Sequence, residues 1–242
     1  MLKEKASEYL SREPIVNSYQ IARLNEEEPK VFLDDEEDPS GVLILRDETV
    51  TLRGRKITVQ DLLSGKLEKS KEYRFHAVDH QSFKAAEDVI EIKDDRPTWM
   101  LVRLYESPSE SKSDVKPLEE KDASVINEYW GLGSDDSTDY IESRIDQGPA
   151  YGIRKDGELI GWCLTHFVTE RAMVMGMLHV KEKWRRKGFA EDLTEALCEE
   201  AEEKDLVPAV QIFKDNEPSL SLAEDLGFEK RAEHHWFSGV KK

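Results

Sequence analysis

Residues 178–190 read LHVKEKWRRKGFA, and this stretch decides how the surrounding chain folds. It runs from the apolar end of a strand, through a basic segment and a glycine, into a helix. Five of the seven residues in 181–187 are Lys or Arg, although the chain of 242 residues has a formal net charge of −17. Because the free N–H groups and the dipole of a helix N-terminus attract anions, this local reversal of charge favours an anionic ligand at the helix start.

The segments on either side of this stretch predict a sheet with helices on both faces. Residues 172–180 (AMVMGMLHV) are apolar without alternation, which is typical of a strand that is covered on both faces. Gly176 within that strand indicates either a bulge or a close backbone approach. Residues 190–204 carry the apolar stripe of a helix. Residues 150–154 and 158–167 are predicted strands of a hairpin, because Lys-Asp-Gly separates them.

Hydrophobic periodicity and turn residues predict the remaining elements. In the second half we expect strands at 115–118, 208–213 and 228–237 and helices at 119–130, 137–147 and 218–226. In the first half we expect helices at 3–10, 58–67 and 79–90 and strands at 30–35, 41–46, 49–52, 73–78 and 97–105.

The polar stretch SPSESKSD at 107–114 predicts a linker between two domains. The expected division is an N-terminal α/β domain at 1–106 and a second domain at 115–242. Each half has a hairpin followed by helix, strand, helix and strand. This shared order indicates either an internal duplication or the frequent recurrence of that order in short α/β units.

The composition limits the classes of partner. With 52 acidic and 35 basic residues, the chain should repel nucleic acid and anionic membranes. The acidity would suit a cationic partner, and it equally fits a solubility requirement or a salt-rich or hot habitat. There is no apolar run of the ~20 residues that a membrane span needs, and the first ten residues have no signal-peptide core, so a cytoplasmic location is expected.

The cysteines and histidines indicate neither a disulfide nor a metal site. Cys163 and Cys198 fall in a predicted strand and a predicted helix, which favours two buried thiols. His234 and His235 are adjacent, without a second pair of ligands at metal-binding spacing, and are read as strand residues. We therefore expect no metal.

Three motifs together carry a resemblance to a known family. Residues 185–190 (RRKGFA) fit the pattern R-x-x-G-x-A, and residues 215–229 (DNEPSLSLAEDLGFE) contain an Asn, a short helix and Gly-Phe. With the phrase GWCLTH at 161–166, they resemble the GNAT acyltransferases, in the branch of the glycine N-acyltransferases and their FR47-like relatives. The resemblance covers about 115–237. It implies an α/β (α+β) fold with a mixed, mostly antiparallel central sheet flanked by helices, and a degenerate GNAT-like N-terminal half.

The resemblance also assigns roles in binding coenzyme A. The diphosphate would lie at the start of the helix. Gly188 allows close approach there and the small Ala190 opens the helix. The residues of this loop are Arg185, Arg186, Lys187, Gly188, Phe189 and Ala190. Leu178, His179 and Val180 would pair with the pantetheine arm, and a backbone N–H near Leu178 would hold the oxyanion. Asn216 matches a position that touches pantetheine, or else it is a helix-entry residue.

Several residues are candidates for proton transfer. An amine that attacks a thioester must lose a proton to a general base, and the candidates are Glu170, His166 and His179. Glu170 could instead be a turn residue and His166 a half-buried structural histidine. The family often uses a Tyr acid seven residues after the Asn, where this chain has Ala223.

The predicted function is an acyl-CoA-dependent N-acyltransferase that moves acetyl from acetyl-CoA to a primary amine, such as a small amine, a lysine side chain or an N-terminal amine. The alternative is an inactive CoA-binding sensor or regulatory module. A nucleic-acid contact by the basic loop is disfavoured by the acidic helix that follows it. The acceptor, the acyl chain length and the oligomeric state are not predicted.

Overall fold

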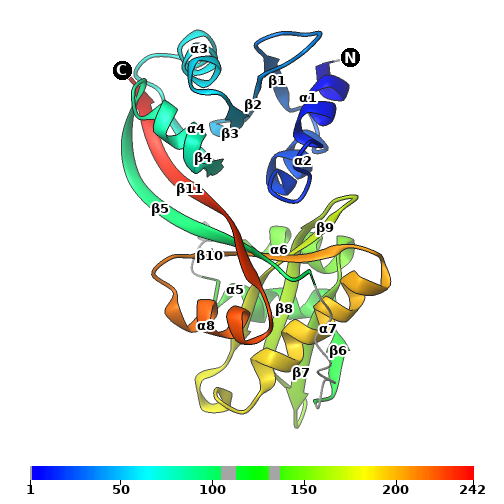
Figure 1. The fold of residues 1–242 in the computed structure, drawn as a ribbon. Helices are drawn as coiled ribbons and strands as arrows, with labels where there is room; N and C mark the ends of the chain where they lie inside the picture. Colours follow the sequence, from blue (N-terminus) through cyan, green and yellow to red (C-terminus); the bar gives the residue numbers. More distant parts are fainter. Residues whose placement is uncertain (1, 105–112, 131–136) are drawn as a thin grey trace. The chain divides into compact units, whose positions relative to one another are not determined.

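The computed structural model describes residues 2–104, 113–130 and 137–242, which form two units. The first unit comprises Met1–Met100, Ile212–Asn216 and Lys230–Lys242, and the second comprises Leu101–Gln211 and Glu217–Glu229 (Figure 1). The strands β5 (Ile90–Val102), β10 (Val207–Phe213) and β11 (Glu229–Lys241) each contribute residues to both units. Most of the predicted linker at 107–114 lies outside the described residues, so the predicted division at that linker stays a prediction.

In the first unit a sheet is covered by helices on both faces, with strand order β1-β2-β3-β4-β11-β5. Alternation along β2 explains the two faces, because Val42 and Ile44 pack with α1 and α2 while Leu43 packs on the opposite side with α3 and α4. The elements are α1 (Leu2–Leu10), α2 (Ser18–Leu24), β1 (Lys30–Leu33), β2 (Gly41–Arg46), β3 (Thr49–Gly54), α3 (Lys56–Lys66), β4 (Glu72–Asp79) and α4 (His80–Ala86).

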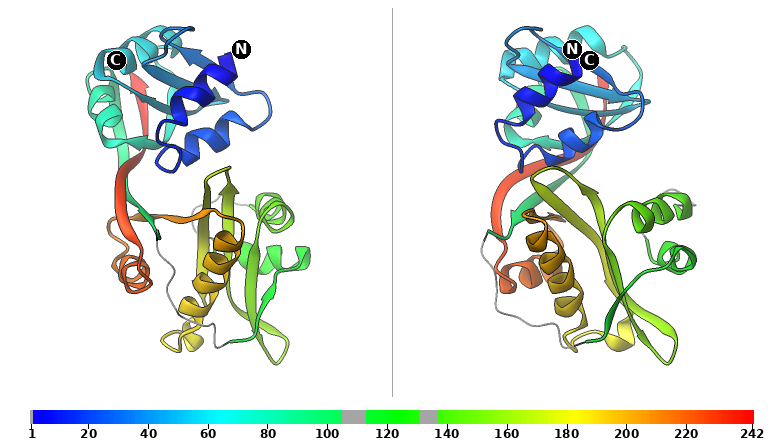
Figure 2. Two further views of the ribbon diagram at one scale, coloured as in Figure 1. Left: turned by 45° about the vertical axis from the view of Figure 1, so that its right-hand side comes forward. Right: turned by 90° about the vertical axis from the view of Figure 1, so that its right-hand side faces the viewer.

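The second unit has strand order β10-β9-β8-β7-β6, in which β10 is parallel to β9 and the other pairs are antiparallel. Trp162 and Leu164 pack under α5 and α6. Gly161 faces Leu193 of α7, so α7 covers the opposite face (Figure 2, right). The elements are β6 (Val115–Pro117), a 3-10 turn η1 (Glu120–Asp122), α5 (Ala123–Asn127), α6 (Thr138–Gln147), β7 (Ala150–Lys155), β8 (Glu158–Val168), β9 (Ala172–Val180), a 3-10 turn η2 (Glu182–Trp184), α7 (Phe189–Glu203) and α8 (Glu217–Asp225).

The predicted fold class is confirmed, and the two units repeat one order of elements. In the first unit an antiparallel pair β2–β3 is followed by α3, a strand β4 parallel to β3, and α4. In the second, an antiparallel pair β8–β9 is followed by α7, a strand β10 parallel to β9, and α8. The N-terminal half therefore repeats the connectivity of the half that carries the motifs.

Three local predictions were wrong. The helix expected at 79–90 ends at Ala86, and β5 begins at Ile90, because Ile90 and Ile92 alternate with Glu91 and Lys93 in a two-residue period. The helix expected at 119–130 is η1 followed by the short α5, which ends at Asn127. Helix α2 was not predicted, because its apolar stripe is weak: two of its four buried residues, Ser18 and Gln20, are polar.

Candidate functional site

A bulge interrupts strand β9 immediately before the basic loop. His179 pairs with Trp162 and Gly176 pairs with Leu164, so two residues of β9, Met177 and Leu178, lie opposite a single residue of β8. Met177 has a φ of 52°, a left-handed conformation that costs a non-glycine residue on the order of 1–3 kcal/mol. We expected the distortion at Gly176, and the structure places it on the next two residues.

Beyond the bulge, β9 continues past its pairing with β10. The parallel ladder joins residues 172–175 of β9 to residues 207–210 of β10, and its last pair is Met175 with Val210. The segment 176–180 follows that last pair. Its backbone edge on the side of β10 can therefore pair with an added extended strand. The pantetheine arm was expected to pair with β9 in this way.

The loop after β9 turns the chain into α7 through left-handed backbone conformations. Arg186 has a φ of 58° and Gly188, which caps α7, has a φ of 86°. The first bond of α7 runs from the Asp192 N–H to the Gly188 carbonyl at 3.0 Å, so the N–H groups of residues 189–191 have no acceptor within the helix. A Cβ at Gly188 would meet no atom within 4 Å. Open space thus borders the N–H groups that an anion would contact.

The basic residues of the loop divide into two groups. Lys181 and Lys183 both pair with Glu158, at 3.1 and 2.9 Å, and these bonds lower the pKa of Glu158. Lys183 is an exposed surface charge, as expected, whereas the Lys181 side chain is only 16% exposed and its Nζ lies 5.7 Å from the centroid of the Tyr129 ring. Arg185 donates from Nε to the Val180 carbonyl at 2.9 Å, which fixes its stem beside the end of β9.

The exposed cations next to the helix start are Arg185, Arg186 and Lys187. Lys187 lies over the Trp184 ring, with Nζ 4.7 Å from its centroid. The three cations and the N–H groups of the first turn of α7 thus lie together, an arrangement that suits an anion.

His166 packs directly on β9 next to the bulge. It is the extra residue of a second bulge, in β8, and its Nε2 lies 2.1 Å from where a Cβ on Gly176 would be, so only glycine fits beneath the ring. Its Nδ1 is hydrogen-bonded to the Tyr140 hydroxyl at 3.2 Å, and its carbonyl accepts from Arg144 at 2.7 Å. The imidazole is held on the face of the sheet that α6 covers.

His179 lies on that same face, beyond the bulge. Its ring stacks on Trp162 at 4.8 Å between centroids and contacts Tyr129 at 4.8 Å. Burial, followed by the nearby charges of Arg185 and Lys181, lowers the pKa of His179 below its ordinary value of 6.5. The imidazole is therefore neutral near pH 7, and among the described residues its buried Nε2 has no hydrogen-bond partner.

The remaining positions that the sequence singled out belong to other segments of the chain. Glu170 is exposed in the turn between β8 and β9, and seven residues of extended strand at about 3.3 Å each put it roughly 20 Å from the bulge. Asn216 falls in the segment 212–216 of the first unit, immediately before α8. Ala223, at the usual position of the Tyr acid, is buried in α8.

Sequence reasoning missed the aromatic groups around the two histidines. Tyr129 lies in the turn after α5, Tyr140 in α6 and Trp162 in β8, and nothing in their spacing relates them to His166 or His179. The one available signal was Trp162 in the phrase GWCLTH, which was read only as part of the motif. Met177 gave no signal, because methionine does not mark a left-handed residue.

Comparison with known families agrees with this arrangement. Residues 150–237, which include β7–β10, the basic loop and α8, match the family model described as FR47-like protein. Over this segment, about a third of the chain, the sequence is therefore similar to FR47-like proteins. No curated protein matches the chain.

Solved structures show the same fold over nearly the whole chain. A Drosophila protein shares 17% identity with a TM-score of 0.71, covering 99% of this chain and 87% of that one. A GCN5-related N-acetyltransferase-like protein from Streptococcus suis shares 16% identity with a TM-score of 0.60, covering 99% of this chain and 100% of that one. A tandem GNAT protein from the clavulanic acid biosynthesis pathway shares 15% identity with a TM-score of 0.58, covering 93% of this chain and 87% of that one. The GNAT fold therefore extends over both units.

Within the described ranges, no helix is long and apolar enough to cross a membrane.

Proposed function

We propose that the chain is an N-acyltransferase that moves an acetyl group from acetyl-CoA to a primary amine by direct attack on the thioester. One continuous feature carries this proposal: the bulge at Met177 and Leu178, the end of β9 beyond its ladder with β10, and the N-terminus of α7 follow one another along residues 176–192. The reactive carbonyl, the pantetheine arm and the diphosphate of the donor follow one another in the same order.

The donor is held at its two ends by different physical interactions. The diphosphate takes the N–H groups of residues 189–191 and the charges of Arg185, Arg186 and Lys187. The pantetheine amides pair with the backbone of residues 178–180 as an added strand. The Leu178 N–H, turned by the bulge, donates to the thioester oxygen as its negative charge develops.

The acceptor enters on the face of the sheet under α5 and α6, where His166 and His179 lie. The amine nitrogen bonds to the thioester carbon, its proton passes to a base, and the C–S bond breaks to release the CoA thiolate. We favour His166 as the base over Glu170, because Glu170 is in the distant turn. When His166 Nδ1–H donates to the Tyr140 oxygen, Nε2 presents its lone pair beside the bulge.

Because residue 223 is a buried Ala, the family's Tyr acid is not present at this position to protonate the departing thiolate. A thiolate leaves readily, so turnover persists with water as the proton source. This same position motivates the alternative that the chain binds CoA without catalysis. The net charge of −17 favours a cationic acceptor such as an amino-acid amine, a polyamine or a lysine side chain. We place this reaction in the cytoplasm.

The test is thiol release from acetyl-CoA with a panel of amines and lysine peptides, next to calorimetric binding of acetyl-CoA. The proposal predicts release that depends on an amine and is fastest with cationic acceptors. Preference for neutral or anionic amines would remove the charge argument. Tight acetyl-CoA binding without release on any amine would establish the alternative.

A further inference from the structure

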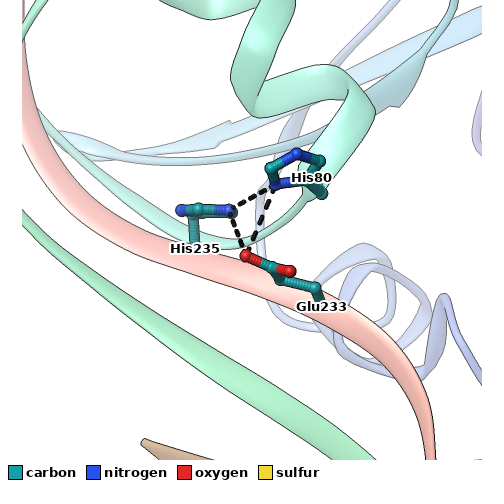
Figure 3. A group of neighbouring side chains, drawn as sticks. All are labelled: His80, Glu233 and His235. Atoms are coloured by element: carbon teal, nitrogen blue, oxygen red, sulfur yellow. Dashed lines mark hydrogen bonds and ion pairs between the residues drawn. The ribbon is translucent and has the colours of Figure 1, made fainter. Parts of the chain in front are cut away.

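Two histidines and a glutamate meet in the first unit, apart from the candidate acyl-CoA site. His80 begins α4, and Glu233 and His235 lie two residues apart on β11, so their side chains extend from the same face of the strand (Figure 3). The chain brings them together from 155 residues apart. None of these side chains has a role in the proposed acyl transfer.

The three nearest ligand atoms form the triangle that a tetrahedral metal site requires. His80 Nδ1 lies 3.0 Å from His235 Nε2, and Glu233 Oε1 lies 3.4 Å from the first nitrogen and 3.3 Å from the second. Zinc binds nitrogen and oxygen ligands at about 2.0–2.1 Å, which places two ligands of a tetrahedron about 3.3–3.4 Å apart. An ion above this triangle would thus reach all three atoms with little movement of the chain.

The surroundings of His235 orient it as a metal ligand. Its Nδ1 lies 3.0 Å from Asp95 Oδ1, and because an ionised carboxylate only accepts, Nδ1 donates the proton. Nε2 of the neutral ring then presents a lone pair toward Glu233 and His80. The ring is also stacked on Phe83, at 3.8 Å and 1° between planes. A carboxylate behind a ligating histidine is the usual support of a zinc site.

We propose that His80, Glu233 and His235 bind a zinc ion, with Asp95 as a positioning residue and the fourth coordination position open to solvent. The ion has access from outside, because the His80 side chain is 51% exposed while that of His235 is 5% exposed. Two imidazoles and a carboxylate suit zinc better than calcium or magnesium, which prefer oxygen ligands.

Lys214 is the group that opposes the ion. Its Nζ lies 2.7 Å from the same Glu233 oxygen and 4.1 Å from the centroid of the Trp99 ring. Zinc therefore displaces this ammonium from Oε1, and the lysine stays against the Trp99 ring. Lys214→Met removes a positive charge next to the ion, so it should tighten zinc binding by at least about tenfold.

The experiment is calorimetric titration of ZnCl₂ into the full chain, with thermal unfolding as a second readout. We expect one ion per chain and a rise of the unfolding temperature with zinc. His80→Gln should weaken binding at least 100-fold, and since His80 is half-exposed this variant should fold. Asp95→Asn should weaken binding about 10–100-fold.

His166→Gln is the matched control, because it removes a histidine of the other unit, and it should bind zinc like the parent chain. Absence of zinc binding by the parent chain would mean that the cluster holds only protons, and would overturn the proposal. Binding that His80→Gln weakens less than tenfold would overturn it as well, because the ion would then lie elsewhere.

Discussion

A negative charge introduced at residue 188 tests the proposed diphosphate site directly. Gly188 has a φ of 86° at the cap of α7, and a Cβ there meets no atom within 4 Å. Asn and Asp tolerate left-handed conformations better than other side chains, so Gly188→Asn and Gly188→Asp carry a similar backbone strain. The two side chains have nearly the same size, and they differ by one negative charge.

The expected size of the effect follows from Coulomb's law. A carboxylate about 6 Å from a unit negative charge of the diphosphate, at an effective dielectric constant of about 20, is disfavoured by roughly 3 kcal/mol. Residue 188 is partly exposed, and screening by salt lowers this to about 1.5–3 kcal/mol. Since 1.36 kcal/mol is a factor of ten, Gly188→Asp should bind acetyl-CoA about 10–100 times more weakly than Gly188→Asn.

Calorimetry of both variants with acetyl-CoA measures this ratio, and repeating it at higher salt should shrink it. S-acetylpantetheine, which lacks the diphosphate, is the matched ligand, and its affinity should be equal for the two variants. Equal acetyl-CoA affinities for Asp and Asn at low salt would refute the placement of the diphosphate at the start of α7.

Three further predictions concern catalysis, pH and stability. His166→Gln should lower kcat by about 10²–10⁴ while acetyl-CoA affinity stays within twofold. Burial lowers the pKa of His234 to about 4, and burial with the charges of neighbouring arginines lowers that of His76 to about 3. Below about pH 6.5 these histidines are protonated in the unfolded chain but stay neutral in the folded chain. The free energy of unfolding should therefore fall as the pH drops from about 6.5 to 5, by about 1.4 kcal/mol per pH unit for each histidine. Arg103→Met should lower the free energy of unfolding by about 3–5 kcal/mol, because it leaves Glu195, whose side chain is 1% exposed and 2.7 Å away, without its counter-ion.

Each of these has a matched control. Urea midpoints measured between pH 7 and pH 5 should show a shallower dependence in His76→Gln, and an unchanged slope would exclude that histidine as a source. Arg103→Met combined with Glu195→Met should recover most of the lost stability, since no buried charge remains. A kcat of His166→Gln equal to that of the parent chain would remove it as the base.

The loop before α7 and the start of that helix were predictable from sequence, because they are built from consecutive residues. The change from apolar strand to basic loop to glycine and helix located the start of α7, and Gly188 adopts the left-handed conformation that this reading required. The resemblance then added the pairing of residues 178–180 with the pantetheine arm, although it gave no reason to place the bulge at Met177 and not at Gly176. Backbone conformation at a bulge depends on the register with β8, which the residues of β9 alone do not encode.

The acceptor face and the histidine cluster were not predictable, because both join residues that are far apart in the chain. Tyr140 reaches His166 across 26 residues and two elements. His235 was read as a plain strand residue, since its partner His80 is in the opposite half of the sequence. Hydrophobic periodicity predicted which face of each helix or strand is buried. Which elements pack against each other became known only from the order of the strands in the sheet.

The most direct test of the central claim is to identify the product. The chain is incubated with acetyl-CoA and the fastest amine, and the N-acetyl amine and free CoA are quantified together by mass spectrometry. We predict one N-acetyl product for each CoA released, with both reduced in parallel in Gly188→Asp at limiting acetyl-CoA. Release of CoA with acetate and no N-acetyl amine, or no release at all, would contradict the assignment as an N-acyltransferase.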